Sequence, residues 1–288
     1  MNIRIALFAL LIGSTTFSHA QKFILSSVWR DSVIVIDGDA ADWDQPFPYF
    51  DSKSKLQYSV VNDAKYIYVS IKTNDSKAQM KIMRAGMDVW FDVTGKKKEV
   101  ATVHFPLRNE SKLDINPDPN EMDQQVVEKP DIRKMKLDWS GSNKDIHTQG
   151  FKNIPAALTQ ADTAKYDIRV AINWDRNDAM TYELRVPLAA FYKEVLTAPD
   201  TLKPITIGIK AYAMDLPMIP SNPGADVSGP ASAGSMSNTG MNNGMPNTMN
   251  NTTRPQTATP QPSMAIPKSV ADMGLPLIVN MKIKLAYR

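Results

Sequence analysis

The segment KYIYVSIKT, residues 65–73, alternates apolar and polar side chains at every second position. Such a period of two is typical of a β-strand that has one buried face and one face toward solvent. The inward-facing set is Ile67, Val69 and Ile71, and the outward-facing set is Tyr66, Tyr68 and Ser70. The segment therefore predicts a strand at the edge of a hydrophobic core, with its tyrosines on the outer face.

The same alternation recurs along the chain. It appears in residues 86–93, 168–174, 182–186, 205–213 and 277–285. The turn-rich DRNDA between the second and third of these segments predicts a β-hairpin. Long helices are not expected, apart from a short helical turn in VPLAAFYKEVL. Many short alternating segments separated by Gly, Pro, Asn and Asp favour antiparallel sheets. The expected fold class is all-β, a two-sheet antiparallel β-sandwich of immunoglobulin-like or jelly-roll-like type.

Two regions depart from this pattern. Residues 109–152 are polar and interrupted by prolines, and we expect a long excursion with a short helix near Met122–Glu128. Residues 217–267 are rich in Met, Asn, Pro and Ser, and they carry too little apolar surface to offset the entropy of ordering. We expect a disordered insertion before the last strand. The predicted domain is therefore single and consists of residues 21–216 plus 268–288.

The first residues have the features of a secretory signal. Arg4 precedes an apolar run over residues 5–12, and Ser18-His19-Ala20 supplies a small-x-small cleavage site. The apolar run is too short to cross a bilayer, and no later stretch approaches the roughly 20 apolar residues that a spanning helix needs. Residues 1–20 are the predicted signal peptide. The mature chain is expected to be periplasmic, cell-surface or secreted, without a membrane span.

Composition excludes several function classes. The chain has no cysteine, which removes disulfides, thiol catalysis and zinc–thiolate sites. Its 33 basic and 30 acidic residues give a net charge of +3, too balanced to predict nucleic acid as a partner. The chain contains no Gly-x-Ser-x-Gly, His-Glu-x-x-His or phosphate-binding glycine motif. Nothing singles out the pair of carboxylates that a glycosidase requires. We expect no enzymatic activity.

An aspartate-rich stretch, VIVIDGDAADWDQPF at residues 33–47, raises the question of a cation site. Its four carboxylates surround one indole and belong to Asp37, Asp39, Asp42 and Asp44, around Trp43. An EF-hand loop that began at Asp37 would place Ala41 at its fifth position and Pro48 at its twelfth, so the ligand pattern fails. Aspartates also serve turns by hydrogen bonding to nearby backbone. A structural turn is the favoured interpretation, and a different cation site and catalytic carboxylates are the alternatives.

The chain resembles the DOMON-like and family-nine carbohydrate-binding-module sandwiches. Those domains open with an Ile-Asp-Gly stretch and then Asp-Trp, as in residues 35–38 and 42–43 here. The matching later blocks follow in the family's order and are YIYVSIKTND, MDVWFDVTGKK, MTYELRVPLAAF and ITIGIKAYAMD. Together they cover most of residues 33–215, plus the final strand. The excursion and the methionine-rich insertion are departures from the family pattern.

The resemblance implies non-catalytic binding, most often of sugars and in some relatives of haem. A sugar site needs exposed aromatic rings beside carboxylates or amides. The candidate ligand-binding residues are Tyr66, Tyr68, Asp88, Trp90 and Asp92. In the alternative interpretation, residues 109–152 cover these aromatic rings, which then pack as a second small core. The two remaining tryptophans considered, Trp43 and Trp174, are interpreted as packing residues.

Cofactor sites have weaker support in the sequence. Haem ligation needs placed Met or His ligands, and His104 sits among apolar residues in ATVHFP, where a structural role is favoured. Met241, Met245 and Met249 recur every four residues, and thioethers suit Cu(I), although methionine can also be incidental in such a linker. We expect no cofactor. The expected partner is a glycan or a cell-envelope component, and the alternative function is an envelope-associated structural or interaction module without a small-molecule ligand.

Overall fold

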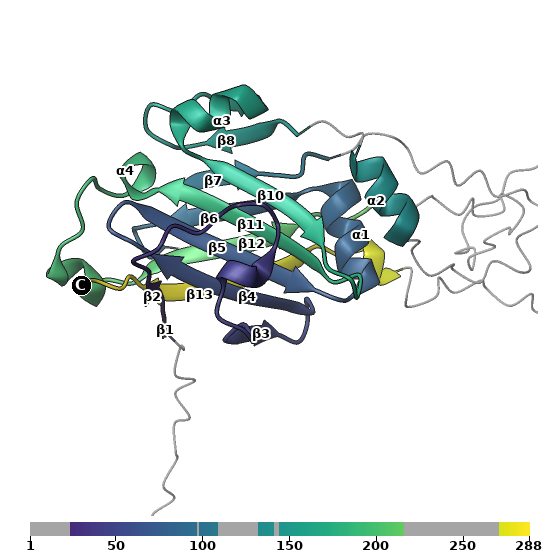
Figure 1. Ribbon diagram of the computed structural model, residues 1–288, viewed down its shortest axis with the longest axis horizontal. Coiled ribbons are helices and arrows are strands. Elements are labelled where there is room, and N and C mark those ends of the chain that lie inside the picture. The colour runs from purple at the N-terminus through teal and green to yellow at the C-terminus, as the bar shows by residue number, and fades with distance from the viewer. Residues whose placement is uncertain (1–23, 97, 109–131, 141–143, 216–270) are drawn as a thin grey trace, which may run out of the picture.

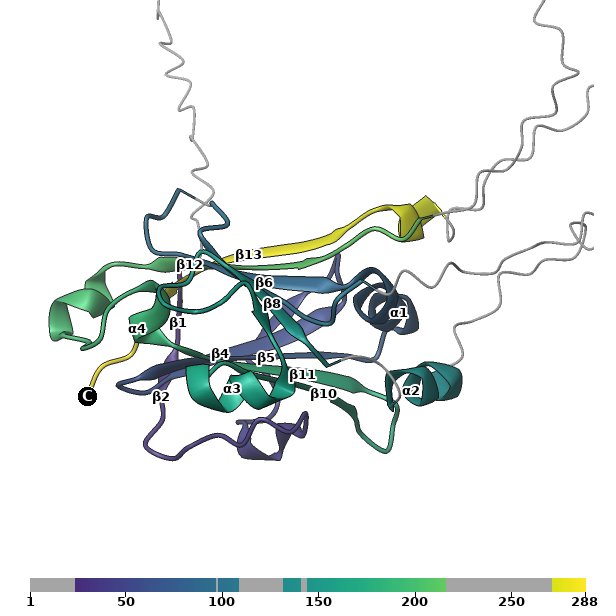
Figure 2. The ribbon, with the colours of Figure 1, turned by 90° about the horizontal axis from the view of Figure 1, so that it is seen from above.

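The computed structural model describes residues 24–96, 98–108, 132–140, 144–215 and 271–288. These residues form two β-sheets stacked face to face (Figures 1 and 2). The predicted two-sheet sandwich is therefore confirmed. The predicted signal peptide, the predicted helix near Met122–Glu128 and the predicted insertion at residues 217–267 lie outside the described residues.

The larger sheet has seven strands in the order β1-β13-β12-β6-β7-β8-β9. Its strands are β1 Ile24–Ser26, β6 Met87–Asp92, β7 Ala101–His104, β8 Ile146–Gln149, β9 Ala157–Leu158, β12 Ile205–Ala211 and β13 Leu277–Lys284. All neighbours pair antiparallel except β1 and β13, which are parallel. Since β12 and β13 are adjacent, the predicted insertion falls between two neighbouring strands, before the last one.

The second sheet has six strands in the order β10-β11-β5-β4-β2, with β3 pairing to β4. Its strands are β2 Val28–Trp29, β3 Tyr49–Asp51, β4 Leu56–Asn62, β5 Tyr66–Thr73, β10 Arg169–Trp174 and β11 Met180–Pro187. Only β2 and β4 are parallel. The predicted hairpin is confirmed: Trp174 of β10 pairs with Met180 of β11. Asp175 closes its turn by accepting hydrogen bonds from the backbone of Asn177 and Ala179.

One hydrophobic core fills the space between the sheets, because every alternating segment turns its apolar side inward. The set includes Ile67, Val69, Ile71, Met87, Val89, Phe91, Ile168, Ile172, Tyr182, Leu184, Val186, Ile205, Ile207, Ile209, Val279, Met281 and Ile283. All of these side chains are buried. The predicted inward-facing positions are thus confirmed on both sheets.

Within the described residues, four α-helices join the strands. They are α1 Ser76–Ala85, α2 Ile132–Ser140, α3 Gln160–Tyr166 and α4 Leu188–Phe191. Short 3-10 turns occur at η1 Ala40–Asp42, η2 Ala198–Leu202 and η3 Asp272–Gly274. Only α4 corresponds to a predicted helical turn. The sequence analysis missed α1, which Asp75 caps by accepting from the backbone N–H of Ala78 at 2.8 Å. Its buried face includes Gln79 and Lys81, so its apolar pattern is broken by polar residues.

Candidate functional site

The predicted ligand-binding residues lie on two different outer faces of the sandwich. Tyr66 and Tyr68 are on the outer face of β5 in the six-stranded sheet, whereas Asp88, Trp90 and Asp92 are on the outer face of β6 in the seven-stranded sheet. Because the sheets are stacked, these outer faces point away from one another (Figure 2). The structure therefore does not bring the predicted residues together as one surface.

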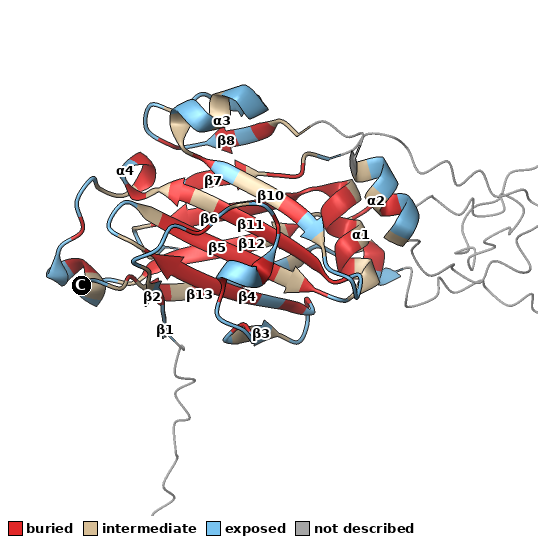
Figure 3. Cartoon of the chain, viewed as in Figure 1, coloured by how far each residue is buried: buried red, intermediate tan, exposed pale blue. Residues whose placement is uncertain are grey.

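Figure 3 colours most of β5 as buried. Tyr68 on this strand is fully buried, so the expectation of an exposed ring at this position is wrong. A second small core covers it, formed by Ile34, Ala40, Trp43, Phe47 and Val61. Its hydroxyl donates to Asp63 at 2.9 Å, and burial raises the pKa of Tyr68. The second-core interpretation thus holds for Tyr68. Among the described residues, the aspartate-rich stretch supplies most of this cover, whereas most of the excursion at residues 109–152 lies outside the described residues.

Tyr66 is partly buried and engaged at both its ring and its hydroxyl. The Arg185 guanidinium lies 4.7 Å from the ring centroid, and the hydroxyl donates to Asp167. Arg185 also pairs with Asp167. One face of the ring is therefore occupied by a cation of the same sheet.

Trp90 is also covered, with 4% of its surface exposed. Its ring lies over Gly208 of β12, where an added Cβ would come within 1.9 Å of the ring atom Cε2. A glycine opposite the indole is what allows the ring to lie flat on the sheet. A covered ring offers no face to a sugar, so the predicted stacking platform is absent at Trp90.

Asp88 and Asp92 are buried but have different surroundings. Asp92 accepts from the backbone N–H and the hydroxyl of Thr94, both at 2.6 Å, and from the N–H of Lys98, so it holds the turn after β6. Asp88 instead accepts from the Tyr212 hydroxyl, and its Oδ1 lies 2.6 Å from Nδ1 of His104. Asp88 is therefore bound to the side chains of His104 on β7 and of Tyr212, the residue after β12.

The aspartate-rich stretch uses its carboxylates in turns and surface pairs. Asp37 accepts from the N–H of Asp39, and Asp39 caps η1 through the N–H of Ala41. Asp42 accepts from the N–H of Val35, and Asp44 pairs with Arg30 at 2.9 Å. These contacts agree with the structural-turn interpretation. No group of three metal-ligating side chains occurs within the described residues.

Glu183 on β11 anchors this stretch and was missed by the sequence analysis. Its carboxylate accepts from the backbone N–H groups of Asp37 and Gly38 and from the indole N–H of Trp43, at 3.0, 2.7 and 2.5 Å. Burial raises the pKa of Glu183 to about 7, although the three donors act in the opposite direction. The alternating pattern of β11 predicts that Glu183 points outward, but it gives no information about the aspartate-rich stretch that covers Glu183.

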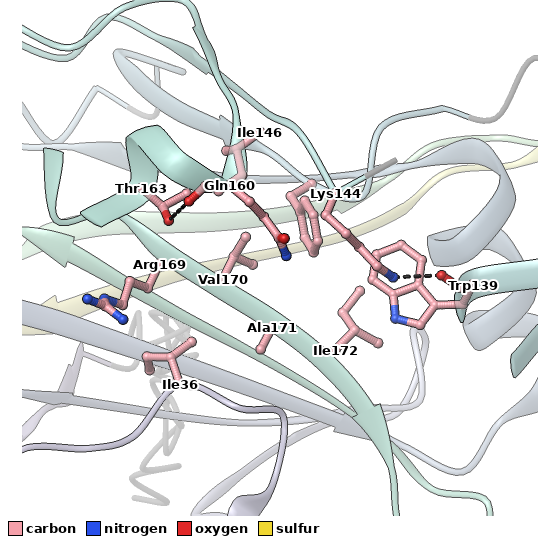
Figure 4. Close-up of a pocket in the computed structure, with 11 residues that line it drawn as sticks. Ile36, Trp139, Lys144, Ile146, Gln160, Thr163, Arg169, Val170, Ala171 and Ile172 are labelled. Carbon is pink, nitrogen blue, oxygen red and sulfur yellow. Dashed lines mark hydrogen bonds between the residues drawn. The ribbon is translucent and has the colours of Figure 1, made fainter. Parts of the chain in front are cut away.

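A pocket of about 340 Å³ opens at the edge of the sandwich, beside β10 and β8 (Figure 4). Strand β10 is the last strand of its sheet, and α3 follows β9 at the edge of the other. The lining residues are Ile36, Phe105, Trp139, Lys144, Ile146, Gln160, Thr163, Arg169, Val170, Ala171 and Ile172. The pocket therefore combines an apolar floor with amide, hydroxyl, indole and cationic groups.

The polar groups come from α2, α3, β10 and the segment just before β8. A capping box between Thr159 and Asp162 begins α3, and Gln160 and Thr163 lie three residues apart on that helix, the spacing of side chains that share a helix face. Lys144 donates to the backbone carbonyl of Trp139 at 2.7 Å, and its Nζ lies 3.0 Å from the indole centroid. Burial lowers the pKa of Lys144 to about 8.

Sequence reasoning could not have found this pocket. Trp139 and Lys144 fall within the excursion at residues 109–152, which has no strong periodicity. Gln160 and Thr163 stand on α3, a helix that was not predicted, whereas Arg169 begins β10, a predicted strand whose polar positions gave no sign of a pocket. The local sequence offered one signal, which is Trp139, an aromatic residue in an otherwise polar segment. The speculative methionine site at Met241, Met245 and Met249 lies outside the described residues.

Comparisons with known proteins give one structural likeness. No protein-family model matches the chain, and no curated protein matches it. Among solved structures, a family-nine carbohydrate-binding module from Caldicellulosiruptor kristjanssonii, in complex with glucose, aligns with a TM-score of 0.32. The alignment has 10% sequence identity and covers 68% of this chain and 80% of that one. The sandwich class of this chain follows from its own sheet order and register.

Every helix in the described part of the chain is too short or too polar to cross a membrane.

Proposed function

We propose that this protein is a non-catalytic binding module that takes a carbohydrate in the edge pocket beside β10. The proposal rests on the pocket itself, which has a volume of about 340 Å³, an apolar floor and several polar groups around it. Small-molecule sites are typically concave, mostly apolar and between roughly 300 and 1,000 Å³ in volume, with a few placed polar groups. The pocket matches this description in volume and in its placed polar groups, and its lining is divided about evenly between polar and apolar surface.

A saccharide presents apolar C–H faces and hydroxyl groups, and the pocket has a counterpart for each. Ile36 and Val170 supply apolar walls for the C–H faces. Gln160 offers both donors and an acceptor, and Arg169 offers several donors in a fixed plane. The complementarity supports a ring-shaped, hydroxylated ligand.

The charge of the pocket favours an acidic saccharide. Lys144 and Arg169 are both cationic, and none of the described residues that line the pocket is a carboxylate. A uronate or another sugar that carries a carboxylate would form charge-assisted hydrogen bonds with these groups. The same lining argues against glycoside hydrolysis, which requires two carboxylates at the scissile bond. The predicted signal at residues 1–20 and the single domain predicted from residues 21–216 and 268–288 are part of this proposal.

Two arginines of the β10–β11 hairpin provide a direct test. Binding of neutral and uronate-containing oligosaccharides would be screened on an array and then measured by calorimetry. Arg169→Ala should weaken binding of the acidic ligand at least tenfold, the usual loss for a hydrogen bond to a charged group. Arg176→Ala, an exposed arginine in the adjoining turn, is the matched control and should bind as the parent does. Equal affinities in the two variants, or no saccharide signal at all, would reject the proposal.

A second candidate function is an envelope-associated structural or interaction module without a small-molecule ligand. The observation in its favour is the burial of Tyr68 and Trp90, which removes the open aromatic surface that was expected. An oligosaccharide array on which the protein binds no saccharide would favour this second function.

A further inference from the structure

The two histidines of β7 and β8 form a cross-strand pair. His104 lies directly opposite His147 in the antiparallel register of these strands. Directly opposed residues project from the same face of a sheet, with Cβ atoms about 4.5–5.5 Å apart. His147 is exposed, and the His104 side chain is 29% exposed. Both imidazoles therefore stand on the outer face of the seven-stranded sheet, at a separation that one ion can bridge.

Asp88 fixes the orientation of the His104 ring. Its Oδ1 lies 2.6 Å from Nδ1 of His104, and its other oxygen accepts from Tyr212. Since a carboxylate only accepts hydrogen bonds, Nδ1 carries the proton, and the lone pair of a neutral ring is then on Nε2. A histidine held by a carboxylate in this way is typical of metal ligands, because the second partner sets both tautomer and ring direction.

We propose that His104 and His147 form a binding site for a divalent transition-metal ion, with Asp88 as a positioning residue. Neutral imidazole suits Zn²⁺, Cu²⁺ and Ni²⁺. No third His, Cys, Asp or Glu completes a ligand group within the described residues, so water fills the remaining coordination positions. The buried carboxylate of Asp88 contributes negative charge one strand away. Lys210 lies opposite Asp88 in the sheet, and its positive charge would disfavour a bound cation. The Glu99 carboxylate, 3.9 Å from the Lys210 ammonium, offsets that positive charge.

The metal site is separate from the edge pocket. Ile146, the neighbour of His147, lines the pocket from the inner side of β8, while His147 projects from the outer side. The two proposals can therefore fail independently.

Zinc titration of the full chain, purified without a histidine tag, tests the site. Calorimetry should show one saturable Zn²⁺ site per chain. His147→Ala, which changes an exposed side chain, should weaken binding at least tenfold, and His104→Ala should do the same. Gln149→Ala, which changes an exposed residue of the same strand, is the matched control and should leave binding unchanged. Zinc is the preferred probe because the methionine-rich segment would compete for copper.

Histidine-selective ¹⁵N NMR distinguishes a metal ligand from a residue that only stabilises the fold, because only a ligand changes its ring-nitrogen shift when zinc binds. The metal-free protein should show His104 protonated on Nδ1, and zinc should shift Nε2 of His104 together with a ring nitrogen of His147. Asp88→Asn should weaken zinc binding about 10- to 100-fold. If Asp88→Asn does not fold, the zinc affinity of His147→Ala and the zinc-dependent NMR shifts test the metal site instead. Unchanged affinity in His147→Ala, no saturable site, or no zinc-dependent shift of the His104 and His147 ring nitrogens would overturn the proposal.

Discussion

The indole N–H of Trp43 donates to a carboxylate oxygen of Glu183 at 2.5 Å, across 140 positions of sequence. Two backbone N–H groups, from Asp37 and Gly38, reach the other oxygen of the same carboxylate. The aspartate-rich stretch is thus held on the outer face of β11 by one buried acid. Its role in the fold is to cover Tyr68 and complete the second core.

Removing the indole should destabilise the domain. Trp43→Ala deletes the largest side chain of the second core and leaves Glu183 without its indole donor, so the free energy of unfolding should fall by about 3–5 kcal/mol. Urea unfolding measures this change. Asp44→Ala, which breaks only the surface pair with Arg30, should cost less than about 1 kcal/mol. Equal losses in the two variants would contradict the anchoring role of Trp43.

Stability should fall as pH rises from about 4.5 to about 7. Burial raises the pKa of Glu183 from its ordinary value to about 7, so folding favours the protonated acid. The stabilisation from protonated Glu183 is fully present below the pKa that this residue has in the unfolded chain. It is lost as Glu183 ionises in the folded protein, and the loss in the free energy of unfolding is at most about 3 kcal/mol. Urea unfolding of parent and Glu183→Gln across this range isolates the effect, since the amide does not titrate. Parallel pH profiles of the two proteins would disprove the assignment.

The glycine under Trp90 should not accept a methyl group. Gly208→Ala would place Cβ 1.9 Å from the indole, and overpacking of this kind costs about 1–3 kcal/mol of unfolding free energy. Combining Gly208→Ala with Trp90→Ala should be less destabilising than the sum of the single changes, because the clash is gone. Thermal or urea unfolding of the four proteins tests this. Strict additivity would mean that the ring does not lie on Gly208.

A buried lysine joins α1 to η3, the 3-10 turn that precedes β13. Lys81 donates to the carbonyls of Asp272 and Leu275 at 2.6 and 2.7 Å, and burial lowers its pKa. Lys81→Met keeps the apolar stem but removes the ammonium donor from both carbonyls. The Asp272 carbonyl still accepts from the backbone N–H of Leu275 at 3.3 Å, so the loss falls mainly on the Leu275 carbonyl, and the free energy of unfolding should drop by about 1–3 kcal/mol. Lys77→Met, one turn earlier on the same helix, should change it by less than about 0.5 kcal/mol. A neutral Lys81→Met would show that the two hydrogen bonds do not stabilise the fold.

Local alternation was enough to predict β5, β6, β10, β11, β12 and β13 with their inner faces, whereas the other strands, among them β4, β7 and β8, were not predicted. The apolar sides of β5 and β6 could be read directly, because a period of two places successive side chains on opposite faces whatever the neighbouring strand is. The helix α1 could not be predicted, since its buried face includes Gln79 and Lys81, whose partners lie elsewhere in the chain. Pattern recognition fails where burial of a polar group depends on a distant partner.

The predicted site failed for a related reason. Alternation showed that Tyr68 and Trp90 point outward, and both do, but it carried no information about what lies over them. For Tyr68 the cover is residues 33–47, and for Trp90 the flat position of the ring depends on Gly208 of β12. Neither contact leaves a trace in the local sequence.

The sequence by itself determined that this chain builds a sandwich of two sheets, because hydrophobic periodicity acts within each segment. Only the tertiary structure decided which outer faces are covered, where the edge pocket opens and that His104 stands opposite His147. Those features depend on strand order and register between segments far apart in the chain, and the free energy that selects them comes from packing and hydrogen bonds made only after the segments meet.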